Sequence, residues 1–424
     1  MASSAVLPAM NEKSQSHTSS GGALSDRLCT AARSIASRHR EPEWLSKKRL
    51  EALEIFAATP VPDRVAHLWR YSDPERFLPA GPAFGESTPE ARIVADGAGS
   101  GVVVQDLHTA AESRAGALRE KLASIVAASS GKFEALNAAL WQGGVLVHVP
   151  RGVEVPTPIH IQRDLGAGAG FFAPRLLVIA EEGASVTVID EYASSGAATQ
   201  NVNAVVELFA GQNAQLRTVT IQRLGAGASL HLSQRAQVER DAKAVSILAS
   251  LGGLIAKADV GSILTGRGAE VELLGFLFGS GRQHFDHHTV HDHRAPSTRS
   301  NLDFKVVVRD RARSAYTGLI RIAPEAPGSE AYQENKNLLL NDGAKVDSIP
   351  ELEILTDEVM CTHGATMGNL DRDHVFYLLS RGIPRPEAER MIIEGFIEPT
   401  LARIPEDLRE GLRGHVEAGL RTLA

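Results

Sequence analysis

Cysteine is scarce in this sequence of 424 residues, which contains only Cys29 and Cys361 and no CxxC pair. Two cysteines this far apart cannot build a disulfide framework, and such usage is typical of proteins from a reducing compartment. Long hydrophobic runs are also missing, because no apolar stretch approaches the roughly 20 residues that span a bilayer. We therefore expect a cytoplasmic protein that has no membrane partner.

Positive charge is not in excess, since 44 Lys and Arg stand against 51 Asp and Glu and give a net charge of -7. Nucleic acids and anionic membrane surfaces are bound by basic patches, so neither is an expected partner. Residues 1–26 are rich in Ser, Gly and Ala and lack the charged-then-apolar pattern of a secretory signal. We expect them to form a disordered tail.

Several enzyme signatures are absent. The sequence has no GxxxxGKS/T phosphate loop, so we expect no nucleotide to be bound by this chain in the P-loop manner. It has no GxSxG, HExxH or Rossmann glycine motif, and no spacing of Ser, His and Asp singles out a nucleophile with a partner base. These absences favour a protein that is not an enzyme.

What is present divides the chain into three regions. Residues 27–135 have mostly helical spacing of apolar residues and predict an N-terminal helical domain. Residues 136–368 alternate apolar and polar residues, are rich in β-branched residues and glycine, and predict strands. Residues 369–424 return to helical spacing and predict a C-terminal helical domain.

The strand region contains a repeat, in which a polar or glycine turn is followed by Ala and then by alternating residues. The alanines lie 30, 28, 27, 43 and 32 residues apart and are Ala184, Ala214, Ala242, Ala269, Ala312 and Ala344. Periods of roughly 20 to 50 residues are typical of solenoids, and a small residue fits a crowded corner where coils stack. We therefore predict a β-helix. A β-sandwich whose turns resemble one another is the alternative.

The C-terminal region predicts three short amphipathic helices. Asp371 is a candidate N-cap for the first helix. Pro386 is expected at the start of the second helix, Pro399 at its end, and Pro405 at the start of the third. Three such helices are too few for an independent core, so we expect them either to cap the end of the solenoid or to offer a groove to a partner.

A histidine-rich segment runs from Gln283 to His293 and holds five of the fifteen histidines. Imidazole and carboxylate groups at this density can bind zinc or iron, and the candidate metal ligands are His284, His287 and His288. On a strand, His287, His291 and His293 would share one face. The alternative interpretation is a polar rung of the solenoid whose imidazoles are hydrogen-bonded, because no zinc signature with its stricter spacing is met.

Cys361 and His363 form a second candidate site. Residues two apart on a strand point to the same side, so a thiolate and an imidazole would share one face there. Such a pair suits iron or zinc. The alternative for Cys361 is a small buried hydrophobic residue.

The stretch from Gln283 to Pro399 resembles the SufB/SufD family, and the match is closest to its SufD members. The resemblance is carried by words in a fixed order: His284-x-Asp286-His287-His288-Thr289, Ala331-Tyr332-Gln333-Glu334-Asn335-Lys336-Asn337, Asp342-Gly343-Ala344, Pro350-Glu351-Leu352-Glu353-Ile354, Cys361-Thr362-His363-Gly364-Ala365-Thr366 and Phe376-Tyr377-Leu378-x-Ser380-Arg381-Gly382. Trp44-Leu45 and Trp69-Arg70-Tyr71 look, more weakly, like the family's helical N-terminal domain. SufB members tend to carry Glu where Gly364 stands and have more cysteines in the core.

The resemblance implies a mainly β fold with helical ends, in which a right-handed parallel β-helix is flanked by helical domains. It implies a subunit that pairs with a SufB-like paralogue through the β-helix and binds a SufC-like ATPase through the C-terminal helices. Such a complex assembles nascent iron–sulfur clusters. The apolar residues expected to bind the ATPase are Phe376, Leu379, Met391, Ile392 and Phe396.

The resemblance also implies a role for His363, which would face the paralogue's essential cysteine. A transient iron–sulfur cluster, or iron, would then be shared between the two chains. This fits the composition, because a cluster needs about four thiolate or imidazole ligands and the core region has one cysteine. Two other functions remain open: an iron-entry module built on His284–His293, and a β-helix enzyme that modifies polysaccharides. The isolated chain is a candidate homodimer.

Overall fold

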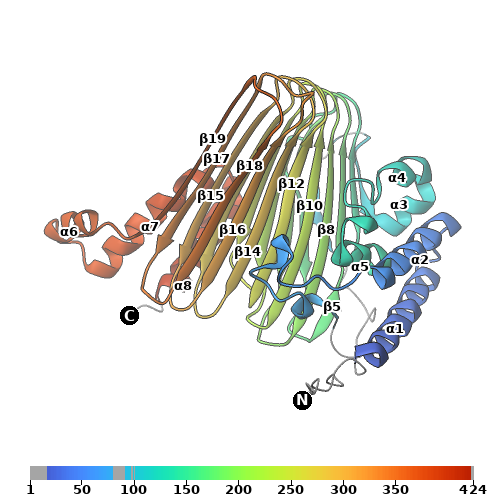
Figure 1. The fold of residues 1–424 in the computed structure, drawn as a ribbon, viewed down its shortest axis with the longest axis horizontal. Coiled ribbons are helices and arrows are strands. Elements are labelled where there is room, and N and C mark those ends of the chain that lie inside the picture. The colour runs from blue at the N-terminus through green and yellow to red at the C-terminus, as the bar shows by residue number, and fades with distance from the viewer. Residues whose placement is uncertain (1–16, 80–90, 97–98, 100, 422–424) are drawn as a thin grey trace, which may run out of the picture.

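The computed structural model describes residues 17–79, 91–96, 99 and 101–421, and its centre is a two-sheet parallel β-solenoid (Figure 1). Each coil contributes one strand to a nine-stranded sheet, called sheet A, and one strand to a ten-stranded sheet, called sheet B. Neighbouring coils pair in parallel in both sheets. The predicted β-helix is confirmed and the sandwich alternative is wrong.

The strands follow one another in a regular order along the solenoid axis. Sheet A consists of β1 (Arg92–Val94), β4 (Ile159–Asp164), β7 (Ser185–Ala193), β9 (Gln215–Arg223), β11 (Lys243–Ser250), β13 (Glu270–Gly279), β15 (Arg299–Val308), β17 (Ser329–Leu339) and β19 (Val359–Asn369). Sheet B consists of β2 (Val103–Asp106), β3 (Val145–Val149), β6 (Arg175–Ala180), β8 (Gln200–Ala210), β10 (Ala228–Val238), β12 (Ile255–Leu264), β14 (His284–His293), β16 (Arg313–Ile322) and β18 (Lys345–Ile354), with β5 (Gly170–Phe172) beside β8.

The corners explain the sequence repeat. Asn213 and Asp241 have φ angles of +59° and +56°, a left-handed conformation that Asn, Asp and Gly adopt most readily. The alanine after each such turn is buried, and its carbonyl accepts a hydrogen bond from the coil above, as Lys243 N donates to Ala214 O at 2.9 Å. A larger side chain would collide with the neighbouring coil.

The six repeats are not equivalent, which corrects the expectation of a single column. Ala184, Ala214, Ala242 and Ala269 stack at the corner that leads from sheet B into sheet A. Ala312 and Ala344 stack at the opposite corner, leading from sheet A into sheet B. The irregular spacing of 43 residues between Ala269 and Ala312 is therefore about one and a half coils.

The N-terminal region covers the outer face of sheet B. It contains α1 (His17–Arg38), α2 (Glu43–Ala58), η1 (His67–Trp69), η2 (Pro74–Phe77), α3 (Leu107–Ser113), α4 (Ala115–Lys121), η3 (Ala128–Ser130) and α5 (Lys132–Leu140). Leu45, Leu107 and Leu118 pack in one cluster with Leu177 and Phe209 of sheet B. Helices from the start of the chain thus seal one side of the solenoid.

Three expectations about this region need correction. Helix α1 begins at His17, within the predicted tail, while residues 1–16 lie outside the described residues. The region expected to be helical also supplies β1 and β2, which pair antiparallel with β4 and β3. Helix α5 extends to Leu140, five residues beyond the predicted boundary at 135.

The C-terminal helices are α6 (Arg372–Ser380), α7 (Arg385–Leu401) and α8 (Glu406–Arg421). Asp371 is the N-cap of α6, as predicted, because its carboxylate accepts from the N–H groups of Asp373 and His374. Pro399 lies inside the last turn of α7 and does not end it. One missing backbone donor there does not stop the last two residues from adopting helical geometry.

These helices do not cap the end of the solenoid, contrary to one of the two expectations. Ile393 and Ile397 of α7 and Leu412 of α8 join a buried cluster with the outer face of sheet A, including Ile247 and Phe276. Helices from the two ends of the chain therefore cover opposite flanks, and α6 projects away from the solenoid (Figure 1). Among the described helices, none is long and apolar enough to cross a membrane.

Candidate functional site

In the part of the chain that the structure describes, no further coil stacks on the last coil of the solenoid. Strands β18 and β19 are terminal in their sheets, and no residue of either strand is fully buried. The preceding strand β16 has seven buried residues out of ten. An edge with unpaired backbone groups along two strands is a template for another chain.

Apolar side chains are exposed at this end. Met360 is 66% and Met367 56% exposed, and Leu355 follows β18 with 55% exposed. Tyr332 and Leu352 are further exposed apolar residues of the last coils. Large apolar side chains gathered around an open edge are typical of a surface that binds protein.

Cys361 and His363 lie on β19, on the side that continues the interior of the solenoid. Their register partners on β17 are Ala331 and Gln333, which are both buried. Because no further coil covers β19, His363 is exposed and Cys361 is half-buried. The predicted common face of the two side chains agrees with this register, and the imidazole is accessible to a second chain.

The thiol of Cys361 is not activated by this chain. Burial raises its pKa, and a backbone hydrogen bond from Ala331 only partly opposes that effect. Among the described residues, no group of three or more His, Cys, Asp or Glu side chains is arranged to hold a metal ion. Any ion bound at His363 would therefore need ligands from outside the described part of this chain.

The interior just behind His363 is polar. The Gln333 Nε2 group donates to Gly318 O at 3.2 Å, across the solenoid. A Cβ atom at Gly318 would lie 2.4 Å from Gln333 Nε2 and 2.5 Å from the Tyr316 hydroxyl, so glycine is needed there. Tyr316 and Thr289 share a hydrogen bond of 2.9 Å. The open end is thus backed by ordered polar side chains.

The histidines of β14 point to opposite sides of the strand. His287, His291 and His293 face the interior, as predicted for one face of a strand. His287 bonds to Ser250 at 3.1 Å, and His293 bonds to Thr298 and Ser300. Burial lowers the pKa of His287 and of His291 to about 3, and that of His293 to about 4, so these rings are neutral.

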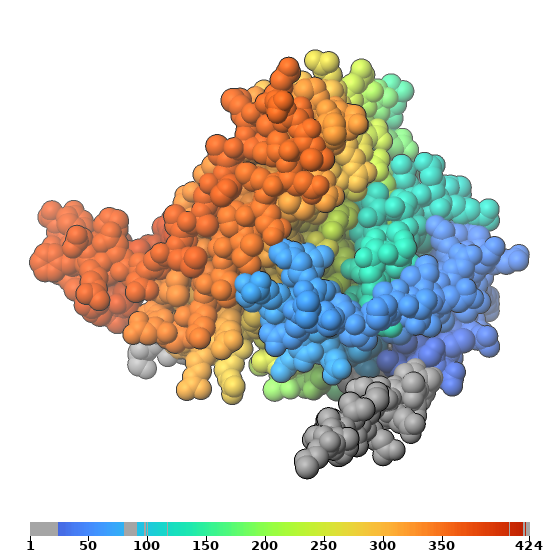
Figure 2. Space-filling view, viewed as in Figure 1, coloured from blue at the N-terminus to red at the C-terminus, as the bar shows by residue number. Residues whose placement is uncertain are grey.

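The outward side of β14 carries His284, Asp286 and His288. Asp286 accepts from His288 Nε2 at 2.9 Å, from Lys257 Nζ at 3.2 Å and from the Ser72 hydroxyl. Burial raises the pKa of the Asp286 carboxyl, but these donors outweigh it and hold that pKa well below its usual range. The group fastens residues 59–78 onto sheet B, where Figure 2 shows them lying over the middle strands.

The three predicted metal ligands of this segment therefore do not converge. His287 faces the interior, whereas His284 and His288 face the covering segment. The Nε2 atoms of His287 and His288 are hydrogen-bonded to protein groups, whereas the Nδ1 atom of each is buried without a partner among the described residues. Most of this segment therefore fits the interpretation of a hydrogen-bonded polar strand of the solenoid. The iron-entry alternative lacks a set of metal ligands among the described residues.

The enzyme alternative calls for charged residues along one solenoid face, and sheet A has such a groove of about 500 Å³. Its charges are paired with one another. Glu272 accepts from Lys243 and from Arg403, each at 2.7 Å, and Arg299 lies 3.3 Å from Glu330. Burial raises the pKa of Glu272, but these two partners lower it overall. A glycosidase needs one carboxyl held protonated, and the partners of Glu272 favour its ionised form instead.

The predicted ATPase-binding residues lie on α6 and α7. Phe376 is 70% exposed, Met391 is also exposed, and Leu379 and Ile392 are half-buried. Phe396 packs against the cluster that joins α7 to sheet A. The first four side chains can contact a partner, and Phe396 chiefly holds the helix in place.

Sequence reasoning missed the contacts that join distant parts of the chain. Ser72 and Asp286 are 214 residues apart, and only the fold brings them together. It also missed the exposure of Tyr332, Met360 and Met367, because their alternation in strands resembles that of interior residues.

Comparison with known proteins gives a consistent result. The family model described as SUF system FeS cluster assembly, SufBD core domain, matches residues 163–396. The model of the SufBD protein N-terminal region matches residues 83–161. Proteins named iron-sulfur cluster assembly SufBD family protein are 27% identical over 409 residues in Staphylococcus epidermidis and 26% identical over 411 residues in Staphylococcus aureus, with 88% of each chain covered in both cases.

Proposed function

Because this chain belongs to the SufBD family of iron–sulfur cluster assembly proteins, we propose that it is a SufD-like scaffold subunit rather than an enzyme. It pairs with a SufB-like paralogue through the last coil of the solenoid and binds a SufC-like ATPase through α6 and α7. The nascent cluster is a substrate held between chains and passed on.

The observation that carries this proposal is the uncovered last coil with His363 on its interior side. A related chain with a matching open coil would continue both sheets and cover the exposed methionines. His363 would then lie within the interface, where the partner's thiolate completes a site that this chain cannot complete alone. An incomplete site suits a cluster that must be released.

The SufD-like assignment rests on residues of the same strand. Gly364 stands where SufB members tend to carry an acidic residue, and Cys361 has a pKa raised by burial. A thiol held protonated is a poor nucleophile and a poor metal ligand. The imidazole of His363 is therefore the better ligand on this chain.

The ATPase contact is supported by α6. Of its nine residues only Val375 is buried, although the helix carries Phe376, Tyr377 and Leu379. An exposed apolar helix held away from the body of the protein fits the groove of a partner. Nucleotide states that bind the helix with different affinity would shift the interface at the last coil.

The test is co-purification of the untagged chain with a tagged SufB-like paralogue and, separately, with a tagged SufC-like ATPase. Met367→Lys is expected to abolish pairing with the paralogue and to spare the ATPase. Phe376→Asp is expected to give the reverse. Both residues are more than half exposed, so neither change should unfold the chain.

Leu50→Lys is the matched control, because Leu50 is an exposed apolar residue of α2, a helix that packs against β6 and β8 and not against the last coil or α6. Retention of paralogue binding by Met367→Lys would show that pairing does not use the last coil. Loss of both partners in one variant would contradict the two-surface arrangement.

A further inference from the structure

A cavity of about 170 Å³ lies between the N-terminal helices and the first coils of the solenoid. It is bounded by α2, by the segment 122–128, by α5 and by the start of β6. Most of its wall is apolar and consists of Leu45, Ala52, Ile55, Leu122, Ala138 and Trp141. Cavities of about 150 Å³ hold molecules the size of benzene.

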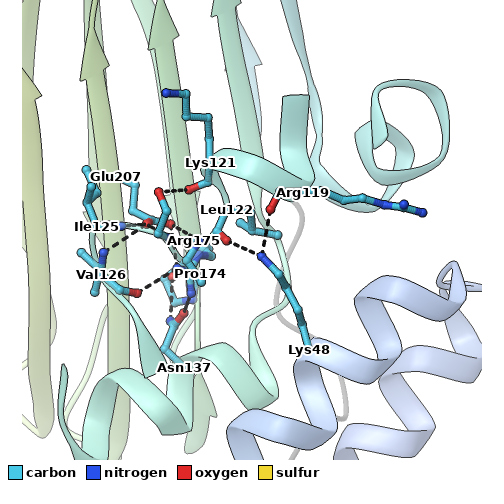
Figure 3. Close-up of polar contacts among 12 residues, drawn as sticks. Lys48, Arg119, Lys121, Leu122, Ile125, Val126, Asn137, Pro174, Arg175 and Glu207 are labelled. Carbon is cyan, nitrogen blue, oxygen red and sulfur yellow. Dashed lines mark hydrogen bonds and ion pairs between the residues drawn. The ribbon is translucent and has the colours of Figure 1, made fainter. Parts of the chain in front are cut away.

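One wall of the cavity is shaped by a buried carboxylate, which Figure 3 shows beside the strands of sheet B. Glu207 accepts hydrogen bonds of 2.8 to 3.1 Å from the backbone N–H groups of residues 123–126. It also accepts from an Arg175 terminal nitrogen at 2.7 Å. Glu207 therefore fixes both the segment and the arginine in place.

Arg175 has one donor left over. Its two terminal nitrogens bond to Glu207 and to Asn137, whereas the Nε–H group is buried and has no partner among the described residues. The side chain is about 1% exposed and lines the cavity. An unpaired buried donor costs roughly 1–3 kcal/mol, so its retention indicates an acceptor that the described part of the chain does not supply.

Lys48 supplies a second donor on the same wall. Its ammonium donates to Leu122 O at 2.9 Å and to Arg119 O at 3.2 Å, so one of its three protons is free (Figure 3). Burial lowers the pKa of Lys48, and the nearby Arg175 lowers it further, while Glu207 and Glu51 oppose both effects. Neutral carbonyls do not offset its charge as a hydrogen-bonded carboxylate would.

The other charged side chains that line the cavity are already paired and are not available to a bound ligand. Arg49 is paired with Glu41 and donates to Ala139 O at 2.8 Å. Glu51 lies at the exposed rim and is 3.9 Å from Lys47. Two free donors, both cationic, remain beside an apolar chamber.

We propose that this cavity binds a small organic carboxylate, with its two oxygens on the Arg175 Nε–H and the Lys48 ammonium and its short apolar tail along α2 and α5. Two donors match the two oxygens of a carboxylate, whereas a phosphate dianion needs more donors. The apolar wall favours a chain of a few carbons over a bare inorganic anion. This inference does not depend on the proposed role in cluster assembly.

The test is isothermal titration of the full chain with sodium butyrate at constant ionic strength. We expect saturable binding at one site, and none of n-butylamine or n-butanol, which have the same tail without the charge. Lys48→Met keeps the stem of the side chain and should weaken butyrate binding at least about tenfold. Lys47→Met, on the exposed side of the same helix, should leave it unchanged.

A second variant covers the case in which Lys48→Met does not fold. Ala128→Leu places three more carbons in the cavity at a half-buried position and should abolish binding while the far-ultraviolet circular dichroism stays native. No saturable binding of straight-chain acids from acetate to hexanoate by the native protein would overturn the proposal. Equal affinity in Lys48→Met and the native protein would overturn it as well.

Discussion

His363 is the single residue whose exposure matters most for the proposed function. Its ring lies on the uncovered side of β19, so removing it breaks no interior packing. Replacement of an exposed residue changes the free energy of unfolding by less than about 0.5 kcal/mol. We therefore expect His363→Ala to keep the thermal midpoint of the native protein and to lower the cluster yield of the reconstituted complex, measured by absorbance and by iron and sulfide content.

A matched control exists on the same strand. Thr362 is exposed on the outward side of β19, so Thr362→Ala removes an accessible polar side chain that does not continue the interior of the solenoid. It should keep the native cluster yield. A native yield from the His363→Ala complex would remove this imidazole from the mechanism.

Glu207, unlike the exposed His363, is fully buried and accepts hydrogen bonds from five donors. Glu207→Gln keeps the shape but turns one acceptor into a donor that faces backbone N–H groups and leaves Arg175 without its counter-charge. Breaking a buried ion pair on one side costs roughly 3–5 kcal/mol. We expect a clearly lower urea midpoint, followed by circular dichroism.

Glu120→Gln serves as the comparison, because Glu120 is an exposed carboxylate on α4, close by in sequence. It should leave the urea midpoint within error. An unchanged midpoint in Glu207→Gln would mean that the segment 123–126 is held by its apolar contacts alone.

For single residues, the sequence could predict which side chains share one face of a strand, but not which distant residues they form hydrogen bonds with. The common face of His287, His291 and His293 follows from the period of a strand, and the structure has it. The four backbone donors around Glu207 come from residues more than 80 positions away. A period of two residues carries no information about such contacts.

The element with the strongest expected pH dependence is β14, because it places three neutral imidazoles in the interior. Burial lowers the pKa of His291 to about 3, and neither ring nitrogen has a hydrogen-bond partner among the residues that the structure describes. In the unfolded chain histidine titrates near 6.5, so the unfolded state takes up protons first as the pH falls. The stability contribution is complete above about pH 6.5 and is lost between there and about pH 3.

His291→Leu removes this titration and keeps the volume of the side chain. Between pH 7 and pH 5 the native protein should lose about 2 kcal/mol more stability than the variant, by linkage at this one site. Urea unfolding at both pH values measures the difference. The exposed His374→Leu should follow the native pH dependence, and an identical slope in His291→Leu would show that this ring is not kept neutral in the folded state.

For strands and turns, the alanine repeat shows which features of the solenoid could be predicted from the sequence and which could not. The alanine spacing predicted coils because each corner must be small and most of the turns contain a left-handed residue such as Asn213. It did not distinguish the two corners, since polar or glycine residues precede both Ala269 and Ala312 in the sequence. The left-handed residue is, however, Gly268 directly before the first of these alanines and Asp310 two residues before the second. The change from one corner to the other appears in the sequence only as the irregular spacing between Ala269 and Ala312.

For the whole molecule, the decisive feature is where the helices lie. Amphipathic patterns predicted helices at both ends of the chain but not which surface they cover. The N-terminal helices pack on sheet B and α7 and α8 pack on sheet A, so both flanks are closed. Among the described residues, no strand pairs with the outer edges of β18 and β19 in the last coil, and β1 and β2 are likewise terminal at the other end of the two sheets.

This arrangement predicts self-association of the isolated chain. A parallel edge of two strands with exposed Met360, Met367 and Leu355 is most stable when a second copy covers it, and no described strand occupies that edge. Sedimentation velocity should therefore show a monomer–dimer equilibrium that shifts with concentration. Met367→Lys adds a charge to the edge and should move the equilibrium to monomer, whereas Leu50→Lys on α2 should not. Addition of the SufB-like paralogue should dissociate the dimer, because self-association and pairing with the paralogue use the same coil. A chain that stays monomeric at every concentration, yet binds the paralogue, would show that pairing requires complementary side chains and not the open edge itself.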